Sequence, residues 1–238
     1  PLTGVAGGSS SSAPNLHLLA SAGAGDNKPR LWDVATGSSY STLYSHNAPV
    51  HGLVWLDGTT LLTGCEEGHI IAHDVRMSGT AWRYTVSGGG ICTMLRMPHP
   101  QDTTNKWIAS GHIGGTVSVF NARTGAVMAS DRLHKDDVRS LDVLAEPKQV
   151  VRSFSGTSRK IPGMPSLVTA SFDGTASLWG VAGSNGGNAD RGRFDRLASL
   201  AGAHGDKILG CCVLPHSQNI LTSGADGVVA LWSPPTAR

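Results

Sequence analysis

The sequence predicts an all-β fold made of repeated antiparallel sheets, and three observations support this. The 238 residues include 31 glycines, which is typical of many tight turns rather than long helices. A nine-residue pattern recurs five times along the chain. Each copy is accompanied by further short apolar runs at similar places, so the repeating unit is larger than one hairpin.

The nine-residue pattern begins at a turn and continues as a strand. Its copies are GDNKPRLWD (25–33), EEGHIIAHD (66–74), IGGTVSVFN (113–121), FDGTASLWG (172–180) and ADGVVALWS (225–233). The second position holds Asp26, Glu67, Gly114, Asp173 and Asp226, and the eighth holds Trp32, His73, Phe120, Trp179 and Trp232. Acidic and glycine residues suit a tight hairpin turn, and the apolar residues that follow alternate with a period of two.

Three more runs complete each unit. One precedes the turn, as in LLTGC (61–65); another lies further upstream, as in VHGLVWL (50–56); a fourth follows the pattern, as in AWRYTVS (81–87). Four short antiparallel strands at intervals of 41 to 59 residues are typical of a β-propeller blade. We therefore expect a single propeller domain over 1–238, with repeat cores near 1–45, 49–87, 90–133, 137–203 and 207–233.

A histidine recurs at the turn between consecutive units. His46, His134 and His204 each stand four residues before the first strand of a unit, and Ser87 takes this place in the remaining case. The column is in phase with the nine-residue pattern, so we expect it to belong to the same repeating structure.

Together these residues resemble the WD-repeat (WD40) family of β-propellers. The family's terminal Trp-Asp pair is intact only at Trp32-Asp33, and no Gly-His pair is intact in the histidine column. The resemblance implies a network in each blade that joins His, Ser or Thr, Asp and Trp side chains by hydrogen bonds. Because the same residue types recur in phase, we interpret them as structural; catalysis would need only one set.

The resemblance assigns these networks residue by residue. One set is complete: His134, Ser171, Asp173 and Trp179. A second lacks only the hydroxyl: His204, Gly224, Asp226 and Trp232. A third is degraded, with His46, Cys65, Glu67 and His73, and a fourth has lost the network, with Ser87, His112, Gly114 and Phe120. Asp26 and Trp32 are the members found in the first unit.

The number of blades is a separate question. The family commonly has seven, whereas this sequence has five first-to-third strand sets and only four outer strands. PLTGVAG resembles the inside of a first strand, and LWSPPTAR follows a third strand. We expect either a stretch of a larger propeller of about seven blades, or a small or incomplete one finished by a partner's strand.

The composition and motifs argue against several functional classes. There is no glycine-rich phosphate-binding motif, no HExxH and no GxSxG, so we expect no enzyme, no cofactor, no metal site and no small-molecule substrate. No run approaches the roughly 18 apolar residues of a membrane span. The four cysteines form no CxxC, which favours reduced thiols in an intracellular protein; cytoplasmic, cytoskeletal or ciliary, and nuclear locations stay open.

Three long insertions, 97–106, 145–166 and 182–195, are predicted to lie on one face of the propeller, as binding sites or as solvated loops. Candidate partner-binding residues are Arg152, Phe154, Arg159, Lys160, Arg193 and Phe194. The prediction is a non-catalytic protein–protein interaction scaffold, a WD-repeat subunit of a multi-protein complex. The alternative is a propeller that binds nucleic acid or a ribonucleoprotein through the basic 145–166 loop, which the net charge of +2 does not favour. A propeller enzyme has the least support.

Overall fold

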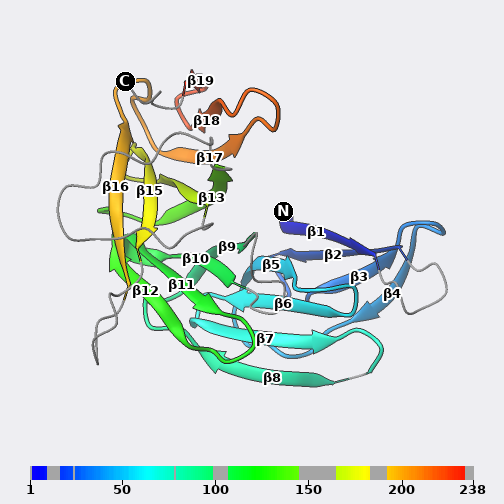
Figure 1. Cartoon of the computed structure of the whole chain (residues 1–238). Coiled ribbons are helices and arrows are strands. Elements are labelled where there is room, and N and C mark those ends of the chain that lie inside the picture. The colour runs from blue at the N-terminus through cyan, green and yellow to red at the C-terminus, as the bar shows by residue number, and fades with distance from the viewer. Residues whose placement is uncertain are drawn as a thin grey trace.

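The structure is a computed structural model that describes residues 2–9, 17–23, 25–77, 79–98, 107–144, 165–182 and 192–233. Within these ranges the chain forms β-strands, joined by turns and one 3-10 segment at Ile113–Gly115. The strands make five antiparallel sheets that follow one another around an arc (Figure 1). The predicted all-β propeller class is confirmed.

Each sheet takes its strands from one continuous part of the chain. The first contains β1 (Leu2–Ser9), β2 (His17–Gly23), β3 (Arg30–Asp33) and β4 (Ser38–Thr42); the second contains β5 (Val50–Trp55), β6 (Thr60–Cys65), β7 (His69–Asp74) and β8 (Thr80–Thr85). The third contains β9 (Ile91–Met97), β10 (Trp107–His112), β11 (Thr116–Asn121) and β12 (Val127–Arg132). The fourth contains β13 (Val138–Leu144), β14 (Ser166–Ser171), β15 (Ala176–Ala182) and β16 (Arg193–Leu200), and the fifth contains β17 (Ile208–Val213), β18 (Ile220–Gly224) and β19 (Val229–Trp232).

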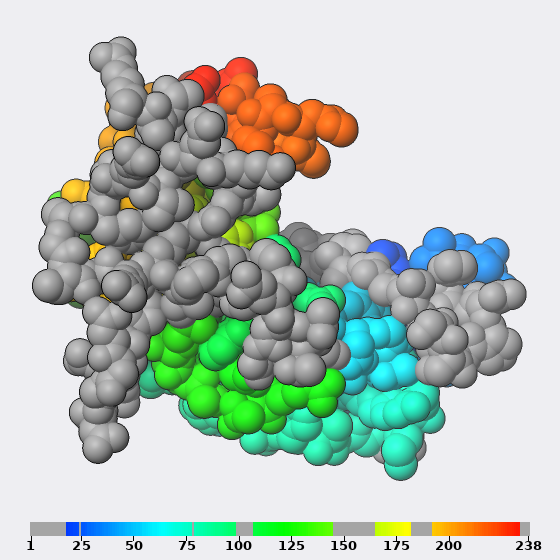
Figure 2. Space-filling model, in the orientation of Figure 1, coloured from blue at the N-terminus to red at the C-terminus, as the bar shows by residue number. Residues whose placement is uncertain are grey.

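The first strands of consecutive sheets contact one another: β1 meets β5, β5 meets β9, β9 meets β13 and β13 meets β17. The fourth strands β4, β8, β12 and β16 lie on the outside of the arc (Figure 1). This radial order is that of propeller blades. As a space-filling surface, the fifth sheet (orange to red) is separated by open space from the first (blue) (Figure 2). That more blades exist stays a prediction.

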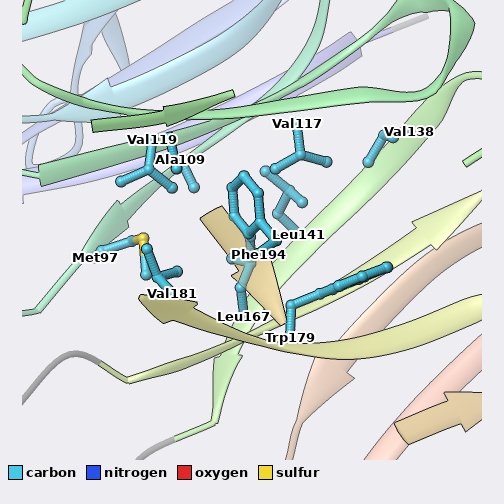
Figure 3. Close-up of a cluster of buried hydrophobic side chains, with 11 residues drawn as sticks. Met97, Ala109, Val117, Val119, Val138, Leu141, Leu167, Trp179, Val181 and Phe194 are labelled. Carbon is cyan, nitrogen blue, oxygen red and sulfur yellow. The ribbon is translucent and has the colours of Figure 1, made fainter. Parts of the chain in front are cut away.

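A separate apolar cluster fills each joint between neighbouring sheets, because strand residues alternate between the two faces of a sheet. Between the third and fourth sheets, Met97 and Val119 meet Leu167, Trp179 and Phe194 (Figure 3). Leu178, which follows β15's alternation onto the other face, packs instead in the cluster with the fifth sheet. The eighth-position residues thus face the preceding sheet: Trp179 packs on the third sheet and Phe120 packs on the second.

Candidate functional site

The fourth sheet holds a buried polar network centred on one hydroxyl group. Thr169, in the middle of β14, is fully buried. The Trp179 indole Nε1–H donates to Thr169 Oγ1 at 2.9 Å, and His134 Nε2 lies 2.7 Å from the same oxygen. His134 precedes β13 and Trp179 belongs to β15, so one hydroxyl ties the inter-sheet turn to two strands.

The other side of the imidazole faces the hairpin carboxylate. His134 Nδ1 lies 3.1 Å from Asp173 Oδ2, and the Lys135 N–H donates to the same oxygen at 2.9 Å. The Thr175 hydroxyl donates to Asp173 Oδ1 at 2.6 Å. Burial opposes ionisation of Asp173, but the hydrogen bonds from Thr175 and Lys135 and the interaction with His134 outweigh it and hold the pKa of the carboxyl below its usual 3.8.

His134 is neutral near pH 7, because burial lowers its pKa more than Asp173 raises it. A neutral ring has one donor and one acceptor nitrogen. The distances fit a single chain of donors, in which Trp179 donates to Thr169, Thr169 donates to Nε2, and Nδ1–H donates to Asp173. Each of the three donating side chains in this series has a hydrogen-bond partner.

The fifth sheet repeats this arrangement, so the expectation that its set lacks a hydroxyl was wrong. Thr222 supplies it: Trp232 Nε1–H donates to Thr222 Oγ1 at 2.8 Å, and His204 Nε2 lies 2.8 Å away. His204 Nδ1 lies 3.3 Å from Asp226 Oδ1. The assignment failed because it sought the hydroxyl at Gly224, directly before the turn, whereas it lies two residues earlier.

Ser171 stands in the fourth sheet where Gly224 stands in the fifth, and it does not supply the network hydroxyl that the sequence assigned to it. Its hydroxyl donates to the Asp136 carbonyl at 3.0 Å and accepts the Asp173 N–H at 3.1 Å. Ser171 therefore supports the hairpin turn, and Thr169 holds His134 and Trp179.

The second sheet keeps the hydroxyl but replaces the tryptophan by histidine. Thr63 Oγ1 lies 2.6 Å from His46 Nε2 and 3.0 Å from His73 Nε2. Glu67 lies 3.8 Å from His69 instead, and His46 Nδ1 is buried without a hydrogen-bond partner among the described residues. Burial lowers the pKa of both His46 and His73 to about 4, so both rings are neutral near pH 7.

The first and third sheets carry reduced versions. Ser110 Oγ lies 2.9 Å from His112 Nε2, so a histidine at the end of β10 replaces the missing turn histidine. The expectation that this sheet has lost the network was therefore wrong for the hydroxyl–imidazole pair. In the first sheet, Trp32 Nε1–H donates to Ser21 Oγ at 2.7 Å, and Asp26 pairs with Arg30.

All five sheets thus share one feature, a Ser or Thr hydroxyl on the second strand. This residue lies two positions after the one that pairs across the ladder with the eighth residue of the repeated pattern. The five residues are Ser21, Thr63, Ser110, Thr169 and Thr222. A network repeated in every sheet supports a structural part for these histidines and aspartates, as the in-phase recurrence in the sequence predicts. In the described part of the chain, no group of three or more His, Cys, Asp or Glu could hold a metal ion.

The predicted partner-binding residues divide into two groups. Arg152, Phe154, Arg159 and Lys160 lie outside the described residues. Arg193 and Phe194 do not belong to the insertion loop but begin β16. Phe194 is only 9 % exposed and lies in the middle of the cluster of Figure 3, so its assignment as an exposed anchor was wrong. Arg193 is exposed and pairs with Asp195 at 3.1 Å.

Sequence reasoning did not single out a group on the opposite face, where the hairpin turns and the inter-sheet turns meet. We call Arg139, Phe172 and Lys207 the turn-face cluster. The Arg139 guanidinium carbon lies 5.1 Å from the centroid of the Phe172 ring, and Lys207 Nζ lies 4.7 Å from it. The three residues are 33 and 35 positions apart in the sequence. Pairing of β13 with β14 brings Arg139 close to Phe172, and packing of the fifth sheet on the fourth adds Lys207.

A cavity of about 230 Å³ lies between the first and second sheets. Its lining includes Leu31, Tyr44 and Ser45 from the first sheet, and His73 and Met77 from the second. His73 occupies the eighth position, which holds a tryptophan in the first, fourth and fifth sheets, and it lines this cavity.

No helix among the described residues is long and apolar enough to cross a membrane. A family model described as "WD domain, G-beta repeat" matches residues 195–233, which include most of β16 and the whole of the last predicted unit, 207–233.

Several curated proteins are similar to the chain over longer stretches. Eukaryotic translation initiation factor 3 subunit I of Botryotinia fuckeliana (strain B05.10) is 27 % identical over 176 residues, which cover 69 % of this chain and 47 % of that protein. Its counterpart in Sclerotinia sclerotiorum (strain ATCC 18683 / 1980 / Ss-1) shows the same identity and coverage. Meiotic fizzy-related protein 1 of Schizosaccharomyces pombe (strain 972 / ATCC 24843) is 21 % identical over 227 residues, covering 85 % of this chain and 51 % of that protein.

The chain spans about half the length of these curated relatives. The family match falls on the unit whose Thr222–His204–Trp232 network is fully formed, and the same plan extends through the four preceding sheets. On these grounds, residues 195–233 form a WD repeat, and the chain as a whole resembles the WD-repeat family of β-propeller proteins.

Proposed function

We propose that the protein is a non-catalytic interaction scaffold, a WD-repeat subunit that holds other proteins in a multi-protein assembly. One observation carries this proposal: the histidines and aspartates that could resemble a catalytic constellation are engaged in the networks that hold the blade turns together. His134 and Asp173 are satisfied by Thr169, Thr175 and Lys135. What the fold offers a ligand is its rigid outer surface.

The relatives support the same class of function. Two of them are by name subunits of a translation initiation factor, which is a multi-component assembly. They share 27 % identity with this chain and extend well beyond its length, so we carry over the general role of a subunit and not the particular assembly. An intracellular, cytoplasmic location is part of the proposal.

The insertion face stays our candidate for one partner contact. Arg152, Phe154, Arg159 and Lys160 combine positive charge with an aromatic ring, the composition of binding hot spots. Arg193, exposed at the start of β16, adjoins the insertion that precedes it. We leave Phe194 out of this group because its ring is part of the core.

The test is affinity purification of the tagged chain from cells, in parallel with a variant that carries alanine at Arg152, Phe154, Arg159, Lys160 and Arg193. We expect the unaltered chain to elute with protein partners in fixed stoichiometry after nuclease treatment. The variant should fold equally well and lose at least one partner. A chain that elutes alone would contradict the scaffold proposal, and association that nuclease abolishes would favour the nucleic-acid alternative.

A further inference from the structure

The turn-face cluster has the chemistry of a binding site. Phe172 is partly exposed in the hairpin turn after β14, Arg139 is on β13, and Lys207 directly precedes β17. Both cations approach the ring within about 5 Å of its centroid. The face of an aromatic ring attracts cations, so the ring holds these two charges in place without neutralising them.

Neither cation has a carboxylate partner among the residues that the structure describes. The nearby aspartates accept hydrogen bonds from backbone groups instead. Asp206 accepts the Lys207 N–H at 2.7 Å, Asp136 accepts the Asp137 N–H at 2.8 Å, and Asp137 accepts the Gly114 N–H at 3.0 Å. Arg76 and Arg193, in contrast, are paired with Asp74 and Asp195. What sets Arg139 and Lys207 apart is that both lie against one aromatic ring.

We propose that the turn-face cluster binds an extended acidic segment of a partner protein, with carboxylates two residues apart. The inference rests on the proposed scaffold function and names a second contact surface for it. Two groups that each lie within about 5 Å of one centroid are at most about 10 Å apart. In an extended peptide, side chains two residues apart point to the same side, about 7 Å from each other.

The individual groups fit this occupant. Arg139 can bind a carboxylate through two parallel N–H groups, and Lys207 supplies a mobile point charge. Leu209, two residues beyond Lys207, is 51 % exposed and offers apolar contact to the aliphatic part of a glutamate side chain.

A protein segment suits the cluster better than a nucleic acid. Asp136, Asp137 and Asp206 lie next to the two cations in sequence or through the contacts above, so the surface is not a continuous basic patch. A polyphosphate backbone needs many cations in a row to displace its counterions. Two carboxylates need only two.

The four phenylalanines allow a direct test by ¹⁹F NMR of the full chain labelled with 4-fluorophenylalanine. Phe172→Leu assigns the Phe172 signal, and the rings of Phe120 and Phe194 are buried internal controls. The probe is the peptide acetyl-Gly-Glu-Ser-Glu-Gly-amide, and its matched control carries glutamine in place of both glutamates. We expect the acidic peptide to shift only the Phe172 signal, in a saturable way, and the glutamine peptide to leave it unchanged.

Charge variants then connect the shift to the cations. The double variant Arg139→Gln, Lys207→Gln should raise the dissociation constant of the acidic peptide at least about tenfold. The matched control is Lys28→Gln, because Lys28 lies 5.1 Å from the Tyr44 ring centroid on another part of the surface. It removes one positive charge from the same kind of contact, as each single variant Arg139→Gln or Lys207→Gln does, and should leave the dissociation constant within about twofold.

Three outcomes would overturn the proposal: no Phe172 shift at millimolar peptide, an unchanged constant in the double variant, or an equal response to an oligonucleotide of uridines. A shift at Phe154 in place of Phe172 would also reject the turn-face cluster, and would leave the insertion face as the binding surface. The affinity purification tests the scaffold itself, so the two proposals can fail separately.

Discussion

The Trp179 indole donates its N–H to the Thr169 hydroxyl at 2.9 Å, across two neighbouring strands of the fourth sheet. Sequence comparison among the repeats draws attention to the tryptophan, but the threonine is the residue on which His134 also converges. The Thr169 hydroxyl is therefore the hydrogen-bond partner of two buried nitrogen atoms, Trp179 Nε1 and His134 Nε2.

Removing this hydroxyl should be costly. Thr169→Val keeps the shape of the side chain and leaves Trp179 Nε1 and His134 Nε2 without a partner, at about 1–3 kcal/mol for each buried group. We expect a loss of about 2–4 kcal/mol in the free energy of unfolding, measured by urea denaturation. Thr169→Ser, which keeps the oxygen, is the control, and equal destabilisation by both variants would contradict the assignment.

Acid should destabilise the second sheet through its two neutral histidines. Burial lowers the pKa of His46 and His73 to about 4, against 6.5 when they are exposed in the unfolded chain. As pH falls below 6.5, the histidines of the unfolded state take up protons first, so the free energy of unfolding decreases. This decrease should be complete near pH 4 and reach up to about 3 kcal/mol for one histidine.

Asp173 acts at lower pH, because its pKa is lowered in the folded state. Its stabilising contribution is present above the ordinary aspartate pKa and disappears as pH falls through the lowered value. The measurement is urea denaturation from about pH 7 down to about pH 2, so that the series passes through the titration of the histidines and of Asp173. A flat profile in the unaltered chain would refute buried neutral histidines.

A tryptophan in place of His73 should restore the common network. The adjacent cavity of about 230 Å³ can accept a larger ring, and the Thr63 hydroxyl is already placed to receive an indole N–H. We expect His73→Trp to raise the melting temperature by a few degrees and to weaken the acid sensitivity, because one titrating ring is removed. His73→Phe fills the space without a donor, so the difference between the variants reports the hydrogen bond.

Gly115 has no room for a side chain. Its φ is +92°, and a Cβ atom there would lie 2.1 Å from the His134 carbonyl oxygen. We expect Gly115→Ala to cost about 3 kcal/mol or more, since it combines backbone strain with a clash. The neighbouring Gly114, with φ +78° and nothing within 4 Å of its Cβ position, is the matched control and should cost about 1 kcal/mol.

The cysteines should differ sharply in reactivity. Cys212 is exposed, whereas burial raises the pKa of Cys92 to about 11 and that of Cys211 to about 12. A thiol-specific disulfide reagent at neutral pH should therefore modify one thiol quickly in the folded protein and four in urea. The substitution Cys212→Ser should abolish the fast phase, and a fast phase that persists would contradict the burial of the others.

Much of the strand plan could be predicted from the sequence, because period-two alternation and turn residues are local signals. The runs 91–97 and 138–144 coincide with β9 and β13. The predicted insertion 182–195 includes the start of the fourth strand of the fourth sheet, which spans Arg193–Leu200, because the glycine-rich segment obscured where strand pairing resumes. That misplacement put Phe194 on the surface instead of in the core.

The polar networks were less predictable, because hydrogen-bond partners depend on which face of a strand each residue occupies. The residue directly before or near the hairpin turn was assigned to the hydroxyl position of the network, which gave Ser171 and Gly224. Counting across the ladder, from Trp179 to its partner Leu167 and two residues on, gives Thr169. A Ser or Thr stands at this place in every repeat, but it is found only when the pairing between strands is known. The turn-face cluster had no local signal at all.

Elements with extensive contacts always belong to one sheet or to two consecutive sheets. The described sheets pack face to face around the arc, and a separate apolar cluster joins each pair of neighbours, so the mechanical strength is that of the individual joints. Arg139 and Phe172 belong to the fourth sheet, and Lys207 directly precedes the first strand of the fifth. A ligand bound to both cations would bridge the fourth and fifth sheets. Its binding would therefore stiffen the joint between these two sheets.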